Sequence, residues 1–332
     1  MPKPNLWTTQ EDNYIIQNLN VKTSNEMGQT LGRSRYAIDN RIARLRSRMS
    51  NPTDISENRG FSVKPVPSAN RPVEEVLADQ MEAYRRKSER WQNKHEGIEI
   101  KIQDPGPYAI ALFGDAHVDD NGCDLEALVR DMDLVHERKH VYAINLGDLS
   151  NNWIRALGHL YGKQNTTDDE AAALIEWLVA YLPWMVCILG NHDMWSPIAE
   201  RICKHAGVQH VSHGGILKVI CGDDVTMIDA RHTHRGNSMY NPSHGQLKRN
   251  YRGSPCDIII GGHTHQSAYT MVRNGISGKL GHAIRVGAYK KFDEYADANG
   301  FDEDWISPSV MAVIDPKAKS DVEKIHVFHS FE

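Results

Sequence analysis

The 332-residue chain lacks the features of secreted and membrane proteins. Its five cysteines have no paired spacing, which excludes a disulfide framework and indicates reduced thiols. The first residues hold no apolar core for a signal peptide, and no run approaches about 18 apolar residues. We therefore expect a cytoplasmic protein with no membrane partner. The sequence leaves the oligomeric state open.

A strong excess of one charge is also lacking, since the formal net charge is −5. The charge nevertheless divides unevenly along the chain. Residues 1–95 carry 16 Lys and Arg against 11 Asp and Glu, whereas residues 96–332 carry 22 against 32. A basic arm on an acidic domain suggests that the arm handles a polyanion. The length allows one large domain and a small one.

Five short clusters of metal-ligand residue types are present between Gly114 and His265. They are Gly-Asp-Ala-His (114–117), Gly-Asp (147–148), Gly-Asn-His-Asp (190–193), Arg-His-Thr-His (231–234) and Gly-Gly-His-Thr-His (261–265). Each cluster follows an apolar run typical of a strand covered on both faces. These runs are residues 108–113, 141–146, 184–189, 225–230 and 257–260. Because α/β proteins place ligands on the loops beyond their strands, we expect the clusters to converge.

The residue types in the clusters suit a pair of divalent cations. Imidazole and carboxylate together favour Mn, Fe, Zn or Ni, and the absence of cysteine ligands argues against a structural zinc knuckle. A lone Asp after a strand can bridge two cations about 3.5–4 Å apart. Such a pair produces hydroxide at neutral pH and stabilises a five-coordinate phosphorus. The clusters therefore predict a phosphoesterase.

The order D-x-H, G-D, G-N-H-D, H, G-H-x-H resembles that of the calcineurin-like metallophosphoesterase superfamily over about residues 98–332. The resemblance implies an α/β domain built as a four-layer αββα sandwich, with two divalent metal ions, Mn being favoured. It implies one metal held by Asp115, His117 and His265. It implies a second metal held by Asn191, His232 and His263, with Asp148 bridging both.

The resemblance also implies catalytic residues. His192 takes the catalytic position, where it can protonate a leaving group. Asp193 would orient His192, as carboxylates commonly orient imidazoles at metal sites. Side chains alternate along an extended segment, so His232 and His234 lie on the same side and either can be the ligand. We favour His232 because it directly follows the strand.

The chain departs from the family pattern at a few positions. Asn151 stands where an Asp often follows the bridging Asp by three residues. Asp193 stands where the Ser/Thr protein phosphatase branch has Glu, and the Asp-Arg-Gly motif of that branch is missing. These departures argue against protein phosphatase activity.

Residues 1–50 predict a small all-α domain with a helix-turn-helix. Capping boxes at Thr8 and Thr23 predict two helix starts, and an arginine-rich helix follows Ser34. The segment resembles Myb-type or homeodomain-like domains, which implies that its arginines meet DNA phosphates and that a few side chains reach bases. The candidate contacts are Arg35, Asn40, Arg41 and Arg44, of which we expect Arg35, Asn40 and Arg41 to reach base edges. The alternative is a basic helix that only packs on the larger domain.

Residues 51–97 predict a Pro-rich mobile linker and a charged connecting helix. We expect the apolar stripe of this helix to pack on the metallophosphoesterase domain, residues 98–332, because it is too short for a coiled coil. Residues 236–253 predict a loop in which cations lie beside aromatic residues and could hold a nucleic acid. Its cations are Lys248, Arg249 and Arg252. The alternative is a plain surface loop.

Together these features predict a two-metal phosphodiesterase that acts on DNA, with in-line attack by a metal-bridging hydroxide. The nearest functional analogues are the DNA repair nucleases of the superfamily, and a phage or bacterial DNA-processing protein fits the domain order. One alternative is a hydrolase of cyclic nucleotides, small phosphodiesters or phosphomonoesters. Another is a DNA-binding regulator with an inactive metal domain.

Overall fold

The computed structural model describes residues 7–49, 71–153, 158–160, 162, 164–236, 238, 240–292 and 308–329. The chain divides into two compact units, residues 1–79 and 80–332. Most of the predicted linker, residues 51–70, lies outside the described residues. None of the described helices has the length and apolarity needed to cross a bilayer.

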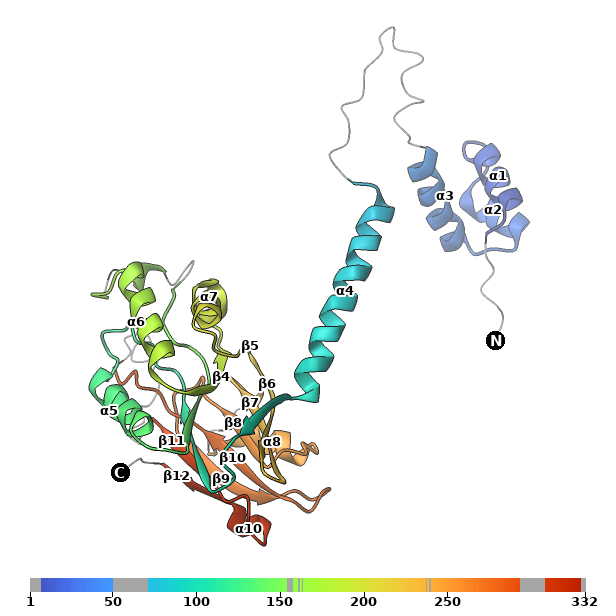
Figure 1. The fold of residues 1–332 in the computed structure, drawn as a ribbon. Coiled ribbons are helices and arrows are strands. Elements are labelled where there is room, and N and C mark those ends of the chain that lie inside the picture. The colour runs from blue at the N-terminus through green and yellow to red at the C-terminus, as the bar shows by residue number, and fades with distance from the viewer. Residues whose placement is uncertain are drawn as a thin grey trace. The chain divides into compact units, whose positions relative to one another are not determined.

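Three short helices form the core of the first unit (Figure 1). They are α1 (Thr9–Asn18), α2 (Ser24–Leu31) and α3 (Arg35–Met49). Both predicted capping boxes are present, because the side chains of Thr8 and Thr23 each accept a hydrogen bond from the backbone three residues ahead. The helices enclose a small core of Ile15, Met27, Ile38 and Leu45. The sequence therefore located these helices correctly, while their use in binding DNA stays a prediction.

The helix α4 (Val73–Glu96) differs from its expected packing. It is helical as predicted, but its apolar stripe is not covered in the described structure. The side chains of Leu77, Met81, Tyr84 and Trp91 are each more than half exposed. Met81, Tyr84 and Trp91 belong to the second unit, so for these residues the expectation that the stripe packs on the catalytic domain was wrong.

Two six-stranded sheets form the centre of the second unit (Figure 1). The first has the order β1-β6-β7-β8-β10-β9. Its strands are β1 (Ile98–Ile102), β6 (Gly214–Cys221), β7 (Asp224–Arg231), β8 (Ile258–Gly261), β10 (Leu280–Arg285) and β9 (Ala268–Arg273). The second has the order β12-β11-β2-β3-β4-β5. Its strands are β12 (Ile325–Phe328), β11 (Val310–Ile314), β2 (Tyr108–Phe113), β3 (Val141–Asn145), β4 (Trp184–Leu189) and β5 (His210–Ser212).

The two sheets pack face to face through a shared apolar core. This core takes side chains from β2, β3 and β4 of one sheet and from β6, β7 and β8 of the other. On its outer face the second sheet is covered by α5 (Leu125–His136), α6 (Asp168–Tyr181) and α7 (Ile198–His205). The helix α8 (His244–Tyr251) contacts β8 and β10 of the first sheet. The chain is therefore a mixed α/β protein with the expected order of helix, sheet, sheet and helix.

The five predicted strand runs are all strands. The runs before the first and third clusters coincide with β2 and β4, and the other three match β3, β7 and β8 to within a residue or so at their ends. The neighbours β2, β3 and β4 are parallel, and so are β7 and β8. Parallel strands end at the same edge of a sheet, so this topology gathers the loops that carry the five clusters.

The segment 236–253 is not the loop that the sequence predicted. Its second half forms α8, which buries Gln246, Leu247 and Asn250. These residues recur at helical spacing and cover the sheet, a pattern that the glycines and charges of the segment obscured.

Candidate metal centre

The backbone of the cluster loops is unusual. The residues Asp115, His117, Asp148, His263 and His265 have φ angles of 50°, 45°, 55°, 76° and 59°. Non-glycine residues seldom adopt positive φ, and such conformations collect at functional sites where the surrounding fold enforces them. Five of the seven expected metal ligands therefore occupy a backbone conformation that the sequence did not reveal.

Two glycines allow these loops to approach one another. A Cβ atom at Gly190 would lie 2.2 Å from Oδ1 of Asp148, and one at Gly262 would lie 2.2 Å from Oδ2 of Asp115. No side chain fits at either distance, so only glycine permits the two carboxylates their positions.

The first group of expected ligands is Asp115, His117 and His265, each of which offers a ligand atom within 4.8 Å of the others. Oδ1 of Asp115 and both ring nitrogens of His117 are buried, and none of the three has a hydrogen-bond partner among the described residues. Leaving such an atom unsatisfied costs about 1–3 kcal/mol. Burial raises the pKa of Asp115 to about 7, and the charge of Asp148 adds to the rise. A cation would satisfy Oδ1 of Asp115 and one ring nitrogen of His117, so this group fits a metal ion.

The second group is Asp148, His232 and His263, whose ligand atoms also lie within 4.8 Å of one another. Nδ1 of His232 lies 2.8 Å from the carbonyl oxygen of Leu146, which can only accept, so this nitrogen carries the proton in neutral imidazole. Nε2 of His232 then points a lone pair at Oδ1 of Asn191, 2.9 Å away, and at Oδ2 of Asp148, 3.2 Å away. Three electron-rich atoms facing one another require a positive charge between them.

The pKa of His232 leads to the same conclusion. Burial acts to lower this pKa, but the hydrogen bond to Asp148 and the charge of that carboxylate raise it to about 9. In Asp148, burial acts to raise the pKa, yet the hydrogen bond from His232 holds it below its ordinary value. The position between the two side chains therefore favours a cation, which can be a proton or a metal ion.

His234 lies outside both groups. Its Nε2 is 3.0 Å from the carbonyl oxygen of Ile260, and burial lowers its pKa to about 4. The structure thus brings together all seven expected ligands, including the favoured His232 rather than His234. Their assignment as metal ligands is a proposal.

His192 lies at the edge of the same centre. Its ring centroid is 5.0 Å from that of His117, 5.1 Å from that of Trp153 and 4.1 Å from that of Trp195. Its Nδ1 contacts the backbone carbonyl oxygen of Asn151. Burial lowers the pKa of His192. The tryptophan rings and the carbonyl thus fix the imidazole beside the metal groups.

Asp193 does not orient His192, which corrects our expectation. Its carboxylate accepts three backbone hydrogen bonds, from Asp148 at 2.7 Å, Leu149 at 3.0 Å and Gly190 at 2.8 Å. A buried carboxylate needs donors, and these amides satisfy it. Asp193 therefore ties the loop after β3 to the loop after β4.

The sequence also missed two cations near the centre. Arg285 is buried and donates to the hydroxyl of Thr264, between His263 and His265, at 2.8 Å. Lys290 is buried and lies 2.9 Å from Oδ2 of Asp120. Arg285 ends the apolar strand β10 and Lys290 follows it closely. A cation inside or beside an apolar run was the one feature of the sequence that could have indicated these buried cations.

Asp120 links Lys290 to Asn151, the residue whose backbone carbonyl contacts His192. The side-chain amide of Asn151 donates to Oδ2 of Asp120 at 2.6 Å, and the carbonyl of Asn151 contacts His192. At the position where the family often has Asp, this chain therefore has a neutral Asn151 side chain, which is hydrogen-bonded to the buried ion pair of Asp120 and Lys290.

Replacing Lys290 by Met is expected to destabilise the second unit. The variant leaves Asp120 buried without its cation, which costs about 3–5 kcal/mol. Urea unfolding, followed by circular dichroism, measures this loss in free energy of unfolding. The double variant Asp120→Asn/Lys290→Met should recover part of it, because no uncompensated charge remains. A single variant as stable as the unaltered protein would contradict the role of the ion pair.

The expected nucleic-acid contacts fall into two sets. Arg35, Asn40 and Arg44 are exposed on α3. Arg41 instead pairs with Asp12 at 2.6 Å and lies over the ring of Trp7, so its contacts hold α3 to α1. Its assignment as a base-reading residue is therefore corrected.

The cations of the 236–253 segment divide in the same way. Arg249 donates to the buried carboxylate of Asp229 at 2.7 Å, as does Arg231. This contact assigns Arg249 to the stability of the sheet, because an unpaired buried Asp229 would be costly. Lys248 is partly exposed and Arg252 is exposed.

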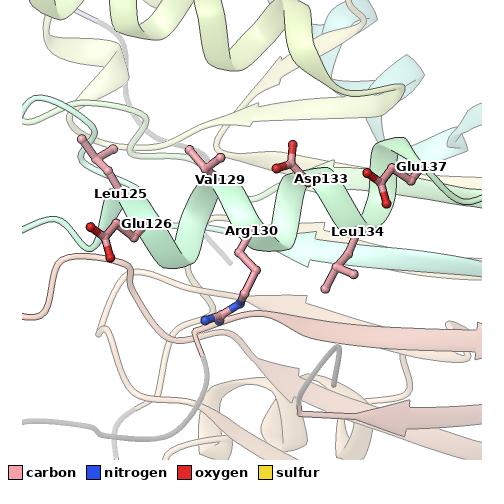
Figure 2. A pocket seen from close by; sticks show the side chains of 7 residues that line it. All are labelled: Leu125, Glu126, Val129, Arg130, Asp133, Leu134 and Glu137. Carbon is pink, nitrogen blue, oxygen red and sulfur yellow. The ribbon is translucent and has the colours of Figure 1, made fainter.

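An apolar groove runs along the outer face of α5 (Figure 2). Its lining combines Leu125, Val129 and Leu134 with the charged residues Glu126, Arg130, Asp133 and Glu137. No expected metal ligand or catalytic residue lines this groove, so it is separate from the candidate centre.

Comparisons with known proteins add to this geometry. Residues 108–267 match the family model of the calcineurin-like phosphoesterases. No curated protein matches the sequence significantly. Among solved structures, an archaeal phosphodiesterase is similar at 14% identity and a TM-score of 0.37, covering 66% of this chain and 98% of that chain. The nuclease MPE of Pseudomonas putida is similar at 15% identity and a TM-score of 0.32, covering 66% and 87%. Likenesses this distant say nothing about the activity of this chain.

The matched residues include all five clusters. They also contain both groups of side chains that fit divalent cations. The strands β1, β9, β10, β11 and β12, which complete the two sheets, lie outside the matched residues. The chain therefore contains a calcineurin-like phosphoesterase domain and is a metal-dependent phosphoesterase, a hydrolase of phosphate esters.

Proposed function

We propose that this phosphoesterase is a two-metal phosphodiesterase that acts on DNA. The observation that carries the choice of DNA is the exposed face of α3, where Arg35, Asn40 and Arg44 project from the first unit. Phosphate contacts from such side chains supply most of the affinity of non-specific DNA binding.

A pocket beside α3 supports this proposal. It is lined by Trp7, Tyr36, Asn40, Arg41 and Arg44. Tyr36 is 76% exposed, and an exposed aromatic ring among cations and an amide suits stacking and hydrogen bonding to a nucleic acid. Arg41 lines the pocket while paired with Asp12, so its main contribution is to fix the shape of the pocket.

The metal centre supports hydrolysis of the phosphodiester. We assign Asp115, His117 and His265 to one metal ion and Asn191, His232 and His263 to the other, with Asp148 bridging them. When bound, two such cations supply a nucleophile at neutral pH and neutralise charge that develops on phosphorus. Carboxylate, amide and imidazole ligands without thiolate suit Mn, and also Fe, Zn or Ni.

The side chain of His192 lies beside this centre, in a position to transfer a proton during the reaction. Nδ1 of His192 donates to the carbonyl of Asn151, so Nε2 is the free nitrogen, and it can give a proton to the leaving oxygen when the ring is in its doubly protonated form. The amide of His192 donates to Oδ1 of Asp148 at 2.9 Å, which couples the placement of the imidazole to that of the bridging carboxylate. Trp153 and Trp195 flank the ring and shield part of it from water.

The test compares two substrates and two proteins. Removing the α3 face with Arg35→Ala/Asn40→Ala/Arg44→Ala should lower kcat/KM on DNA at least about tenfold, since one lost contact costs about 1–3 kcal/mol. Hydrolysis of bis(4-nitrophenyl) phosphate should not change, because this small diester is too short to reach a second binding surface. The loss on DNA should shrink as salt rises, since phosphate contacts weaken with salt.

Other results would select an alternative function. An equal effect on both substrates, or none on either, would favour a hydrolase of small phosphodiesters. Binding of DNA by α3 without any metal-dependent hydrolysis would favour a regulator with an inactive metal domain.

A further inference from the structure

The helix α4 carries an apolar stripe that the described structure leaves exposed. Val73, Leu77, Met81 and Tyr84 follow one another at spacings of four, four and three residues, which places them on one face. Their exposed fractions are 62%, 56%, 60% and 73%. A helix of 24 residues is about 36 Å long, and most of the stability of such helices comes from packing an apolar face. The stripe therefore calls for a partner.

The charges of α4 indicate which partner. The half from Val73 to Tyr84 carries four acidic side chains and no basic one. The half from Arg85 to Glu96 carries five basic side chains against two acidic ones. The helix dipole favours this polarity only in the first and last turns, whereas Glu82, Arg85 and Arg86 lie near the middle.

This polarity makes the helix complementary to itself in one orientation only. In an antiparallel pair the acidic half of one helix faces the basic half of the other, at both ends. In a parallel pair acidic faces acidic and basic faces basic, and like charges repel. An antiparallel pair also has two-fold symmetry, which is the commonest symmetry of homodimers.

We propose that α4 is a dimerisation helix and that the partner of its stripe is α4 of a second copy of this chain, packed antiparallel. Tyr84 then lies near its own copy at the two-fold axis, Leu77 lies opposite the partner's Trp91, and the opposed charges set the direction. The dimer places two first units on one particle, and paired binding modules engage a polymer more tightly than one.

The first experiment measures the mass of the full chain by analytical ultracentrifugation. The wild type should sediment as a dimer, and Leu77→Asp/Met81→Asp as a monomer, a shift of at least about tenfold in dissociation constant. Both replaced side chains are exposed, so neither change removes packing from the core. The matched control is Ile276→Asp, which replaces an exposed apolar residue outside α4 and should stay dimeric. Unchanged hydrolysis of a small phosphodiester would show that the monomeric variant is folded.

The second experiment tests the direction of packing by brief oxidation of single-cysteine additions. Tyr84→Cys lies near the middle of α4 and should form a disulfide-linked dimer. Leu77→Cys should not, because antiparallel packing separates its two copies along the axis. The unaltered protein is the control, since four of its five cysteines are buried.

Three results would overturn the proposal. A wild type that stays monomeric up to about 100 µM, where even a weak helix pair associates, excludes the dimer. A dimer that survives Leu77→Asp/Met81→Asp places the interface elsewhere. Efficient crosslinking of Leu77→Cys shows parallel packing.

Discussion

Replacing Asp148 by Asn should lower kcat for phosphodiester hydrolysis by about 10³–10⁴-fold, the equivalent of several kcal/mol of lost charge stabilisation. Asp148 interacts with residues of both ligand groups and with His192. Its Oδ2 faces Nε2 of His232, its Oδ1 accepts from the amide of His192, and its charge raises the pKa of Asp115. Asn has the same shape but no charge, so it cannot hold two cations close together.

Two measurements check this result. The rate of hydrolysis of a small diester, at saturating Mn²⁺, gives the loss in kcat, and mass spectrometry of the elements gives the metal content per chain. Metal content should fall together with the rate. The matched control is Asp223→Asn, the same chemical change at an exposed residue beyond β6, which should retain full activity. A decrease of less than about tenfold in Asp148→Asn would refute the bridging role.

The second large effect separates two histidines that lie two residues apart. His232→Gln should lower hydrolysis about 100-fold or more and remove one metal ion per chain, because changes even to partners of ligands cost 10–100-fold. His234→Gln should keep its metal and most of its activity. Nε2 of His234 contacts the carbonyl oxygen of Ile260, and a Gln amide can still donate to that oxygen.

The pair of variants contains its own control, since both replace a buried imidazole after β7 with the same side chain. Metal content is the decisive measurement, because it responds to loss of a ligand even if both variants lose some stability. Metal loss in His234→Gln together with retention in His232→Gln would reverse the assignment.

The strands and the convergence of the candidate ligands could be predicted from local patterns. A run such as Trp184–Leu189 is apolar throughout because the strand is covered on both faces, and β4 has the same bounds. The ligands follow their strands directly, so the parallel order of β2, β3 and β4 brings Asp115, Asp148 and Asn191 to one edge. Spacing alone was enough to predict the strands and the convergence of their loops, whereas the assignment of the ligands came from the family resemblance and stays a prediction.

Other assignments failed because they depend on partners far away in the sequence. Arg41 looked like a base-reading residue until its position beside Asp12, 29 residues earlier, became known. Arg249 looked free for a phosphate, but it satisfies the buried Asp229. Asp193 stands next to His192, yet its hydrogen bonds go to backbone amides of two loops. Charge and proximity in the sequence do not say which donor reaches which acceptor.

The sequence by itself determined the α/β class, the helices of the first unit and the convergence of the seven candidate ligands, while their binding of metal, through His232 rather than His234, stays a prediction. These follow from periodicity, capping residues and spacing, which act over a few residues. Only the tertiary structure decided the left-handed backbone at Asp115 and Asp148, the buried Lys290 beside Asp120, and the exposure of the stripe on α4. The reason is that strain, burial and ion pairing depend on what the rest of the chain packs against each residue.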